Sequence, residues 1–170
     1  MEIIFEDLTE KDLPAVKEIY EYYIGNSTVT FHTGNITLEE IKAFIPLGHP
    51  VYKSYLIKED GCTCGYCYLA PYKNRQAYNR TAEVTVYLKK GKTGKGIGGL
   101  ALQQLEKAAR TSFIKVLIGV ITGDNIQSIR LFTREGYEKC AHYREVGEKF
   151  GKILDVVAFQ KIITSMNNEQ

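Results

Sequence analysis

A glycine- and lysine-rich segment, Lys89–Gly99 (KKGKTGKGIGG), constrains the fold more than any other part of this sequence. It follows a run rich in Val, Thr and Tyr, 81–89, that is typical of a β-strand, and it precedes a run with helical periodicity. Glycines tolerate positive φ angles and let several backbone N–H groups point into one concavity. The helix N-terminus and four lysines add positive charge. The segment therefore predicts a strand–turn–helix unit that binds an anion such as phosphate, with a solvated basic turn as the alternative interpretation.

Two common phosphate-binding motifs fit this segment poorly. The G-K-T at 91–93 resembles the end of a P-loop, but the first glycine of that motif would fall at Val86. The G-x-G-x-x-G at 94–99 matches the dinucleotide fingerprint, but a dinucleotide-binding fold needs repeated β-α units and only one clear crossover is visible. A nicotinamide-dependent oxidoreductase is therefore a weaker hypothesis than an enzyme with another phosphate-bearing ligand.

The rest of the composition is that of an ordinary globular chain. Its 170 residues fit one domain, expected over 1–165 with a polar tail at 166–170. The net charge of +2 gives no reason to expect a nucleic acid or an anionic membrane as a partner, and no apolar run reaches the roughly 20 residues of a membrane span. The N-terminal stretch is acidic, unlike an export signal, so we expect a cytoplasmic protein with reduced cysteines.

Hydrophobic periodicity and turn residues predict elements in the order β-α-α-β-β-β-α-β-α-β-β. Three strands, 51–58, 63–69 and 81–89, form a meander that leads into one β-α-β crossover, and a helix and a hairpin follow. The fold class is therefore α+β, with a central mixed, mostly antiparallel sheet flanked by about four helices. The apolar run 116–121 predicts a strand that is covered on both faces. The other predicted elements are strand 2–5, helices 13–24, 38–44, 97–108 and 126–134, and strands 137–146 and 153–163.

The segment 93–98, T-G-K-G-I-G, resembles the R/Q-x-x-G-x-G/A pyrophosphate loop of the GNAT superfamily of acyl-CoA-dependent N-acetyltransferases. Further motifs extend the resemblance over nearly the whole chain. N-x-x-S at 125–128 with L-F-x-x-x-G-Y at 131–137 is similar to the N-x-x-[AS]…L-Y-x-x-x-G-F pattern of that superfamily. The stretches 27–31, 73–87 and 146–156 are similar to the branch that acetylates phosphinothricin and methionine sulfoximine. The resemblance implies a GNAT-like fold, acetyl-CoA as co-substrate with no metal, and a homodimer.

Acyl transfer from a thioester to an amine needs a neutral amine, a stabilised oxyanion and a proton for the leaving thiolate. Glu83 lies in the strand before the glycine loop, and the resemblance places the general base of the branch there. An exposed surface carboxylate is the alternative interpretation. The implied function is acetyl transfer from acetyl-CoA to the α-amine of a small amino acid or analogue. Direct attack in a ternary complex is expected, because no cysteine or serine has an evident base beside it.

The resemblance also implies which residues bind the two substrates. Acetyl-CoA would be bound by Thr85, Val86, Tyr87, Leu88, Thr93, Gly94, Lys95, Gly96, Ile97, Gly98, Asn125 and Ser128. A basic and aromatic segment before Glu83 suits the carboxylate of an amino acid, because the guanidinium fork of arginine binds a carboxylate in bidentate fashion. With one earlier aromatic residue, the predicted substrate-binding set is Phe31, Lys73, Arg75, Tyr78 and Arg80. Residues 149–151 and Asp155 would help to close the substrate side.

Three positions depart from the family pattern. Thr93 stands where Arg or Gln is usual, so Lys92 or Lys95 would have to supply the phosphate contact. Phe132 replaces a tyrosine that often protonates the leaving thiolate. The remaining candidate donors are Tyr87, Tyr143, His142 and water. Ile153 replaces a tryptophan, which would reshape the amine pocket.

The cysteines give a weak indication of zinc. Cys62, Cys64 and Cys67 are close in sequence, but Cys140 is distant, and three thiols without a fourth ligand make a poor structural site. Cys62 and Cys64 are expected to point the same way from a strand. Small apolar strand residues are the simpler interpretation.

Two alternative functions stay open. Within the same fold, the acceptor could be a peptide N-terminus, a polyamine or another amine, although the arginines at 75 and 80 argue against a cationic acceptor. A non-catalytic acyl-CoA-binding module would bind CoA without turnover, and the phenylalanine at 132 is compatible with such a module.

Overall fold

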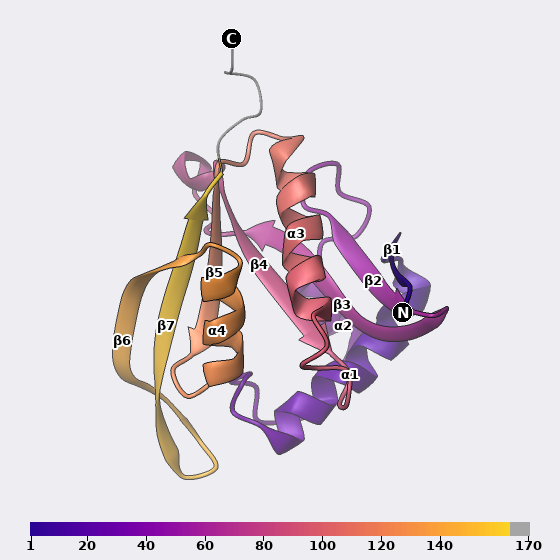
Figure 1. Ribbon diagram of the computed structural model, residues 1–170. Helices are drawn as coiled ribbons and strands as arrows, with labels where there is room; N and C mark the ends of the chain where they lie inside the picture. The colour runs from indigo at the N-terminus through magenta and orange to yellow at the C-terminus, as the bar shows by residue number, and fades with distance from the viewer. Residues whose placement is uncertain (164–170) are drawn as a thin grey trace.

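Seven strands form a single sheet in the computed structural model of the chain, which describes residues 1–163 (Figure 1). The strands are β1 (Ile3–Asp7), β2 (Ser54–Glu59), β3 (Cys62–Pro71), β4 (Thr81–Leu88), β5 (Val116–Thr122), β6 (Glu138–Lys149) and β7 (Lys152–Ile162). The helices are α1 (Leu13–Asn26), α2 (Leu38–Phe44), α3 (Ile97–Arg110) and α4 (Ile126–Arg134), with 3-10 turns at Glu10–Asp12 and Gln76–Tyr78. The spatial order of the strands is β1-β2-β3-β4-β5-β7-β6. The predicted fold class and order of elements are confirmed, and the predicted tail, 166–170, lies outside the described residues.

The predicted antiparallel meander of three strands is present as β2, β3 and β4, and β1 extends it as a further antiparallel strand beside β2. A bulge interrupts the β2–β3 pair, because β3 carries one extra residue, Cys64, opposite Ile57–Lys58. The bulge breaks the regular alternation of side chains between the two faces of the sheet. Cys62 is exposed and Cys64 is buried, so the expectation that both point the same way is wrong.

The parallel pair of β4 and β5, joined through α3, is short. Thr81–Glu83 lie opposite Val116–Ile118, and beyond Glu83 the two strands separate. β5 itself stays paired with β7 from Val116 to Thr122. The part of β4 from Thr85 to Leu88 therefore borders a slot in the sheet on the side that faces β5.

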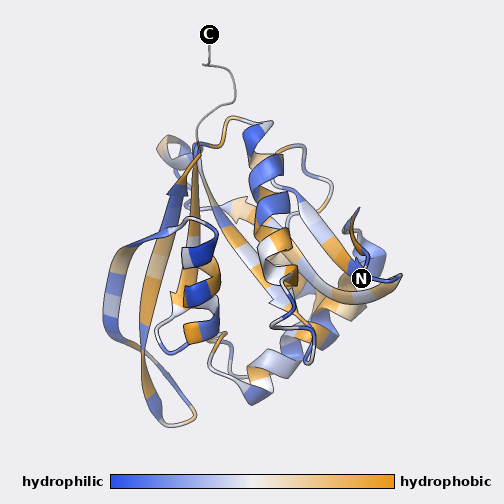
Figure 2. Cartoon of the chain, in the orientation of Figure 1, coloured by the Kyte–Doolittle hydropathy of each residue, from blue (hydrophilic) through white to orange (hydrophobic). Residues whose placement is uncertain are grey.

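Helices cover both faces of the sheet (Figure 1). On one face, Ile97 and Leu105 of α3 pack against the apolar residues of β3, β4 and β5. On the other face, Val16 of α1 and Ile41 of α2 pack against Tyr66 and other residues of β3. Because side chains alternate along a strand, the even-numbered residues of β4 face α3 and the odd-numbered ones face α1. Figure 2 shows apolar residues along the inner strands and a largely hydrophilic β6 at the edge of the sheet.

β5 departs from its prediction at one position. Val120 is 49% exposed, so the strand is not covered on both faces along its whole length. Its side chain lies on the same face as that of Ile118, since the two residues are two positions apart in the strand. On that face α1 packs on β3 and β4 rather than on β5. Val120 therefore remains as an apolar wall beside the slot.

Candidate functional site

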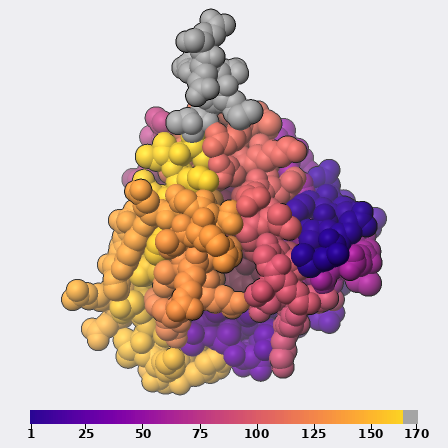
Figure 3. All heavy atoms as spheres, in the orientation of Figure 1, coloured from indigo at the N-terminus to yellow at the C-terminus, as the bar shows by residue number. Residues whose placement is uncertain are grey.

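A cavity of about 1100 Å³ lies where β4 and β5 separate. Figure 3 shows the molecule hollowed between α3 and α4. The lining comes from both faces of the sheet: the glycine loop, α3 and α4 on one side, and α1, α2 and β3 on the other. The slot therefore joins two chambers that a continuous sheet would keep apart. Such a volume suits a small-molecule site that holds two ligands end to end.

The glycine loop forms one end of this cavity and begins α3. Gly94 and Gly96 have φ angles of 74° and 85°, in the region that favours glycine. Gly96 is the N-cap of α3, and no side chain caps the first turn. The first N–H groups of a helix have no intrahelical acceptor, so these groups are available to an anion. The residues of the segment that line the cavity are Thr93, Gly94, Gly96, Gly98 and Gly99.

Two of the residues predicted to bind acetyl-CoA lie away from the cavity wall. Lys95 is not part of the lining, and the Ile97 side chain is fully buried in the core, so only its backbone could contact a ligand. Lys92 is ion-paired with Glu59 of β2, and this hydrogen bond raises the pKa of the lysine and lowers that of the carboxyl. In this conformation neither lysine replaces the usual Arg or Gln at Thr93.

α4 supplies cationic residues that the sequence reasoning missed. Arg130 and Arg134 lie one helical turn apart and line the same cavity as the glycine loop. Their i, i+4 spacing was a usable signal, because residues at that spacing share one helix face. Asn125 caps this helix: its Oδ1 accepts from the Ser128 N–H at 3.2 Å, and its Nδ2 donates to Ser128 Oγ at 2.9 Å. Both residues line the cavity, as do Thr85, Val86, Tyr87 and Leu88 of β4.

Glu83 lies at the point where the two strands separate, and it lines the cavity. Burial raises the pKa of its carboxyl, and the nearby charge of Lys73 opposes the rise. A carboxylate with a raised pKa accepts a proton more readily at neutral pH than an ordinary one. The position and the electrostatics of Glu83 therefore suit a general base.

The wall on the α1 side is aromatic and rich in hydroxyl groups. It contains Tyr20, Tyr23, His32, Phe44, Tyr68 and Tyr87. The rings of Tyr20 and Tyr87 meet edge to face, with their centroids 5.4 Å apart. The Tyr23 hydroxyl donates to the Leu88 carbonyl and so joins α1 to the border of the slot. Apart from Tyr87 these residues were not predicted, because they come from three other elements and only the fold brings them together.

The five predicted substrate-binding residues do not line this cavity. Four of them, Lys73, Arg75, Tyr78 and Arg80, are exposed in the β3–β4 connection. Pro71 at the end of β3 and Asn74 of the connection line the cavity instead. Phe31 packs against β6, where a Cβ added at Gly147 would fall 2.4 Å from its ring.

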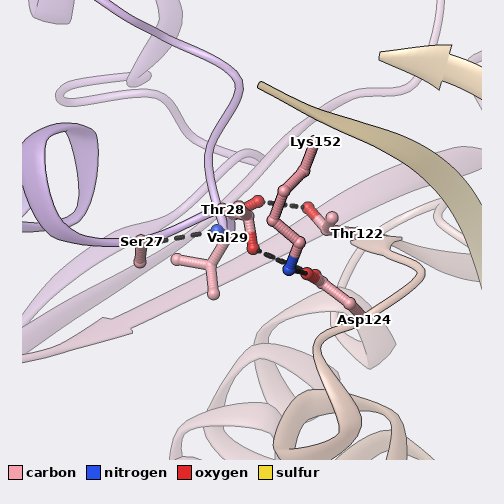
Figure 4. A network of polar contacts seen from close by, with 6 residues as sticks. All are labelled: Ser27, Thr28, Val29, Thr122, Asp124 and Lys152. Carbon is pink, nitrogen blue, oxygen red and sulfur yellow. Dashed lines mark hydrogen bonds and ion pairs between the residues drawn. The ribbon is translucent and has the colours of Figure 1, made fainter. Parts of the chain in front are cut away.

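The loop after α1 is fixed to the opposite half of the sheet by a polar network (Figure 4). Thr28 Oγ1 donates to both carboxylate oxygens of Asp124 at 3.0 Å, and Lys152 Nζ of β7 lies 3.2 Å from one of them. Thr122 Oγ1 of β5 donates to the Thr28 carbonyl at 2.8 Å. The loop that carries Thr30, Phe31 and His32 is thus attached to β5 and β7.

The end of β6 holds the same loop through a buried lysine. Lys149 is 3% exposed, and its Nζ donates to the Thr30 carbonyl at 2.8 Å and to the Tyr23 carbonyl at 3.5 Å. Burial lowers the pKa of this ammonium group. Phe150 next to it is 62% exposed and borders a second, smaller hollow of about 520 Å³ beside Thr28 and Asp124.

The candidate proton donors are separated by the fold. Tyr87 lines the cavity, and burial raises the pKa of its hydroxyl, which is protonated at neutral pH. His142 instead pairs with Asp155, Nε2 to Oδ2 at 2.7 Å, and Tyr143 is 54% exposed on β6. Phe132 lines the cavity with its ring packed on Gly119. Ile153 is 56% exposed at the start of β7, outside the lining.

Residues 1–163 contain no group of three His, Cys, Asp or Glu side chains placed to hold a metal ion. Over the same part of the chain, none of the helices combines the length and the apolar character needed to cross a bilayer.

Comparison with known proteins agrees with this geometry. Residues 6–158 match the acetyltransferase (GNAT) domain family. A phosphinothricin N-acetyltransferase of Streptomyces coelicolor is 32% identical over 157 residues, covering 89% of this chain and 91% of the relative. An L-methionine sulfoximine/L-methionine sulfone acetyltransferase of Pseudomonas paraeruginosa is 30% identical over 166 residues, covering 94% of each. A phosphinothricin acetyltransferase from Sinorhizobium meliloti, solved with acetyl-CoA, superposes with a TM-score of 0.90 at 26% identity, covering 99% of this chain and 93% of that one.

Proposed function

This chain belongs to the GNAT acetyltransferase family, and from that premise we propose that it transfers the acetyl group of acetyl-CoA to the α-amine of a small amino acid or analogue. It is an N-acetyltransferase, and GNAT acetyltransferases use acetyl-CoA. The observation that carries the proposal is the single cavity that holds an uncapped helix N-terminus on one side of the sheet and a half-buried carboxylate at the slot. The amine class is taken from the relatives, whose names specify phosphinothricin and methionine sulfoximine.

The residues of the cavity fit acetyl-CoA. The unpaired N–H groups at the start of α3 and the arginines of α4 would bind its phosphates, while Asn125, Ser128 and the free border of β4 would contact its pantetheine arm. Backbone N–H groups near Val86 and Leu88 would stabilise the oxyanion, as donors worth about 3 kcal/mol in other acyl-transfer sites. The slot then directs the acetyl group toward Glu83.

In the proposed reaction the amine attacks directly within a ternary complex. Glu83 takes a proton from the substrate ammonium, directly or through water. The nitrogen lone pair forms the new amide bond with the acetyl carbon, and the carbon–sulfur bond breaks with its electron pair on sulfur. The thiolate then takes a proton from Tyr87 or from water, and the tyrosinate or hydroxide left behind takes the second proton that the substrate nitrogen loses as the amide forms. Phe31, Lys73, Arg75, Tyr78 and Arg80 are assigned to the outer rim of the amine side, where Lys73 already acts on the charge of Glu83.

We also propose a cytoplasmic homodimer. Exposed apolar side chains on the face of β5, β6 and β7 that includes Ile118 support this assembly: Val120, Tyr143 and Ile162. The four cysteines are free thiols, as a reducing compartment would keep them. Light scattering after size exclusion should give twice the chain mass, and Tyr143→Glu should shift the protein toward the monomer.

Release of free CoA thiol from acetyl-CoA tests the reaction. The amine panel should contain L-phosphinothricin, L-methionine sulfoximine, common amino acids, a polyamine and a peptide with a free N-terminus. Turnover of the amino-acid analogues without turnover of peptide or polyamine supports the proposal. Binding of acetyl-CoA with no turnover of any amine would instead indicate a binding module. Glu83→Gln should lower kcat by about 10²- to 10⁴-fold while the affinity for acetyl-CoA is kept.

A further inference from the structure

The imidazole of His32 is held at the cavity wall by a hydrogen-bonded chain that the proposed reaction does not use. The Tyr20 hydroxyl contacts Thr30 Oγ1 at 2.6 Å on one side and His32 Nδ1 on the other. Phe44 of α2 stacks on the His32 ring, with centroids 6.2 Å apart and planes 25° apart. Tyr20 is 6% exposed, whereas His32 itself is exposed and lines the cavity.

The backbone that carries His32 is fixed as well. Thr28 and Thr30 are attached to β5, β6 and β7 through Thr122, Asp124 and Lys149, as described above. The ring therefore has a defined position although it is exposed. A residue held by both its backbone and its ring is suited to orient a bound molecule.

The chain of hydroxyls occupies Nδ1 and leaves Nε2 for a ligand, and the direction of its hydrogen bonds sets whether Nε2 carries a proton. When Thr30 donates to Tyr20 and Tyr20 donates to Nδ1, a neutral imidazole carries its proton on Nε2. No described residue hydrogen-bonds Nε2. Nε2–H is then a donor available to a molecule in the cavity.

The described wall on the same side of the cavity has no lysine or arginine. Its lining on α1, α2 and β3 consists of aromatic and aliphatic side chains, and the cationic lining residues, Arg130 and Arg134, belong to α4 on the other side of the sheet. Glu83 and Tyr87 lie on one face of β4, with Thr85 between them, and Tyr87 contacts Tyr20. An amine placed at Glu83 would therefore extend toward the His32 end of the aromatic wall.

Resting on the proposed function, we propose that His32 determines specificity by donating a hydrogen bond from Nε2 to an anionic oxygen of the amine substrate. Tyr20 is the positioning residue that sets the tautomer and orientation of the ring. The oxygen belongs either to the α-carboxylate or to an oxyanion at the end of the substrate side chain, which share this chemistry.

Steady-state kinetics with paired substrates test the proposal and separate the two sources. L-phosphinothricin carries both oxyanions, L-norleucine has only the α-carboxylate, and 3-aminopropyl(methyl)phosphinate has only the side-chain oxyanion. We expect His32→Ala to raise the KM for L-phosphinothricin at least tenfold, with a smaller change in kcat and no change in the KM for acetyl-CoA. The single-oxyanion substrate whose KM rises in parallel identifies the oxygen.

Variants of the ring and of its support complete the test. His32→Gln keeps an N–H donor at a similar reach and should recover part of the lost affinity. Tyr20→Phe should raise the same amine KM, whereas Tyr22→Phe, the same change on α1 outside the cavity lining, should not. Unchanged amine KM values in His32→Ala, with turnover intact, would overturn the role of His32. Absence of acetyl transfer by the unmodified protein with every amine would instead overturn the proposed function.

Discussion

Glu83 of β4 lies directly opposite Ile118 of β5, and this is the last pair before the two strands separate. Glu83 therefore lies where the slot begins. The other edge of β4 is paired with β3, and the other edge of β5 is paired with β7. The carboxylate of Glu83 is half-buried because the sheet still surrounds it, yet it reaches the cavity because the next residues of β4 have no partner on β5. One irregularity in the sheet thus sets both the position and the raised pKa of this group.

Glu83→Gln should make the folded protein more stable at neutral pH. The folded-state pKa of Glu83 is raised by burial, so the stability that its protonated form contributes is present below the unfolded pKa and is lost as the pH rises through the folded pKa. A neutral glutamine of the same shape does not ionise, so the variant keeps this stability at neutral pH. Urea denaturation should show a higher midpoint for the variant at pH 7 and a smaller difference near pH 4. A variant that is less stable at pH 7 would contradict the burial argument.

Gly96→Ala should weaken acetyl-CoA binding through its backbone. The φ angle of 85° disfavours any residue with a Cβ by about 1–2 kcal/mol, although the space around the added atom is open. A loop that relaxes to avoid this strain moves the first N–H groups of α3. We expect the KM for acetyl-CoA to rise about tenfold, which corresponds to about 1.4 kcal/mol.

Gly48→Ala is the matched control for that substitution. Gly48 also has a positive φ, 64°, and open space around it, but it does not line the cavity. Both variants should lose similar stability, and only Gly96→Ala should change the KM for acetyl-CoA. Equal KM values for acetyl-CoA in the two variants would show that the glycine loop does not bind the phosphates of acetyl-CoA.

Gly119→Ala should destabilise the fold by about 1–3 kcal/mol through overpacking. A Cβ at this position of β5 would fall 2.3 Å from Cε1 of Phe132, whose ring packs there and against Tyr137. Gly25→Ala at the end of α1 meets nothing within 4 Å and serves as the neutral comparison. Urea titration measures both, and equal midpoints would show that the Phe132 ring can move aside.

Asp155→Asn should lower stability at neutral pH and lose its effect in acid. The Asp155 carboxylate accepts the Glu145 N–H at 2.8 Å and contacts His142, and these bonds lower its pKa from the ordinary 3.8. A lowered pKa contributes stability that is present above the unfolded pKa and is lost as the pH falls through the folded one. The difference between parent and variant should therefore be constant near pH 7 and shrink below about pH 4. If the difference in stability between parent and variant persists unchanged in acid, the effect comes from packing and not from the charge of Asp155.

The sequence predicts the fold of this protein better than the set of residues that line its cavity. Strand and helix order follow from periodicity and turn residues, and the glycine- and lysine-rich composition of the loop predicts its position before α3. Local patterns do not report contacts between distant elements, which is why the direct contact of the Tyr20 hydroxyl with His32, twelve residues further along the chain, was not predicted. They also do not show which cations are already paired: Lys92 is held by Glu59, and the arginines that line the cavity come from α4.

The exposure of Val120 was not predicted for the same reason, because it depends on contacts between distant elements. Its apolar neighbours predict a strand covered on both faces, but coverage depends on where the helices lie, and α1 packs on β3 and β4. The bulge at Cys64 likewise follows from the pairing of β2 with β3, which no pattern within β3 alone reveals.

The short β4–β5 pair also divides the molecule for folding. Within the sheet, three residue pairs join β1–β4 to a C-terminal unit of β5, α4, β7 and β6 that is held together by much longer ladders, and α3 and the contacts of Thr28 and Thr30 add to this join outside the sheet. Such a seam is where sub-global opening is expected, with each side closing as its own cooperative unit. Amide hydrogen exchange should therefore show the Thr81–Glu83 and Val116–Ile118 border exchanging ahead of the β5–β7 ladder, so that the passage for the substrates coincides with the shortest strand pairing described in the sheet.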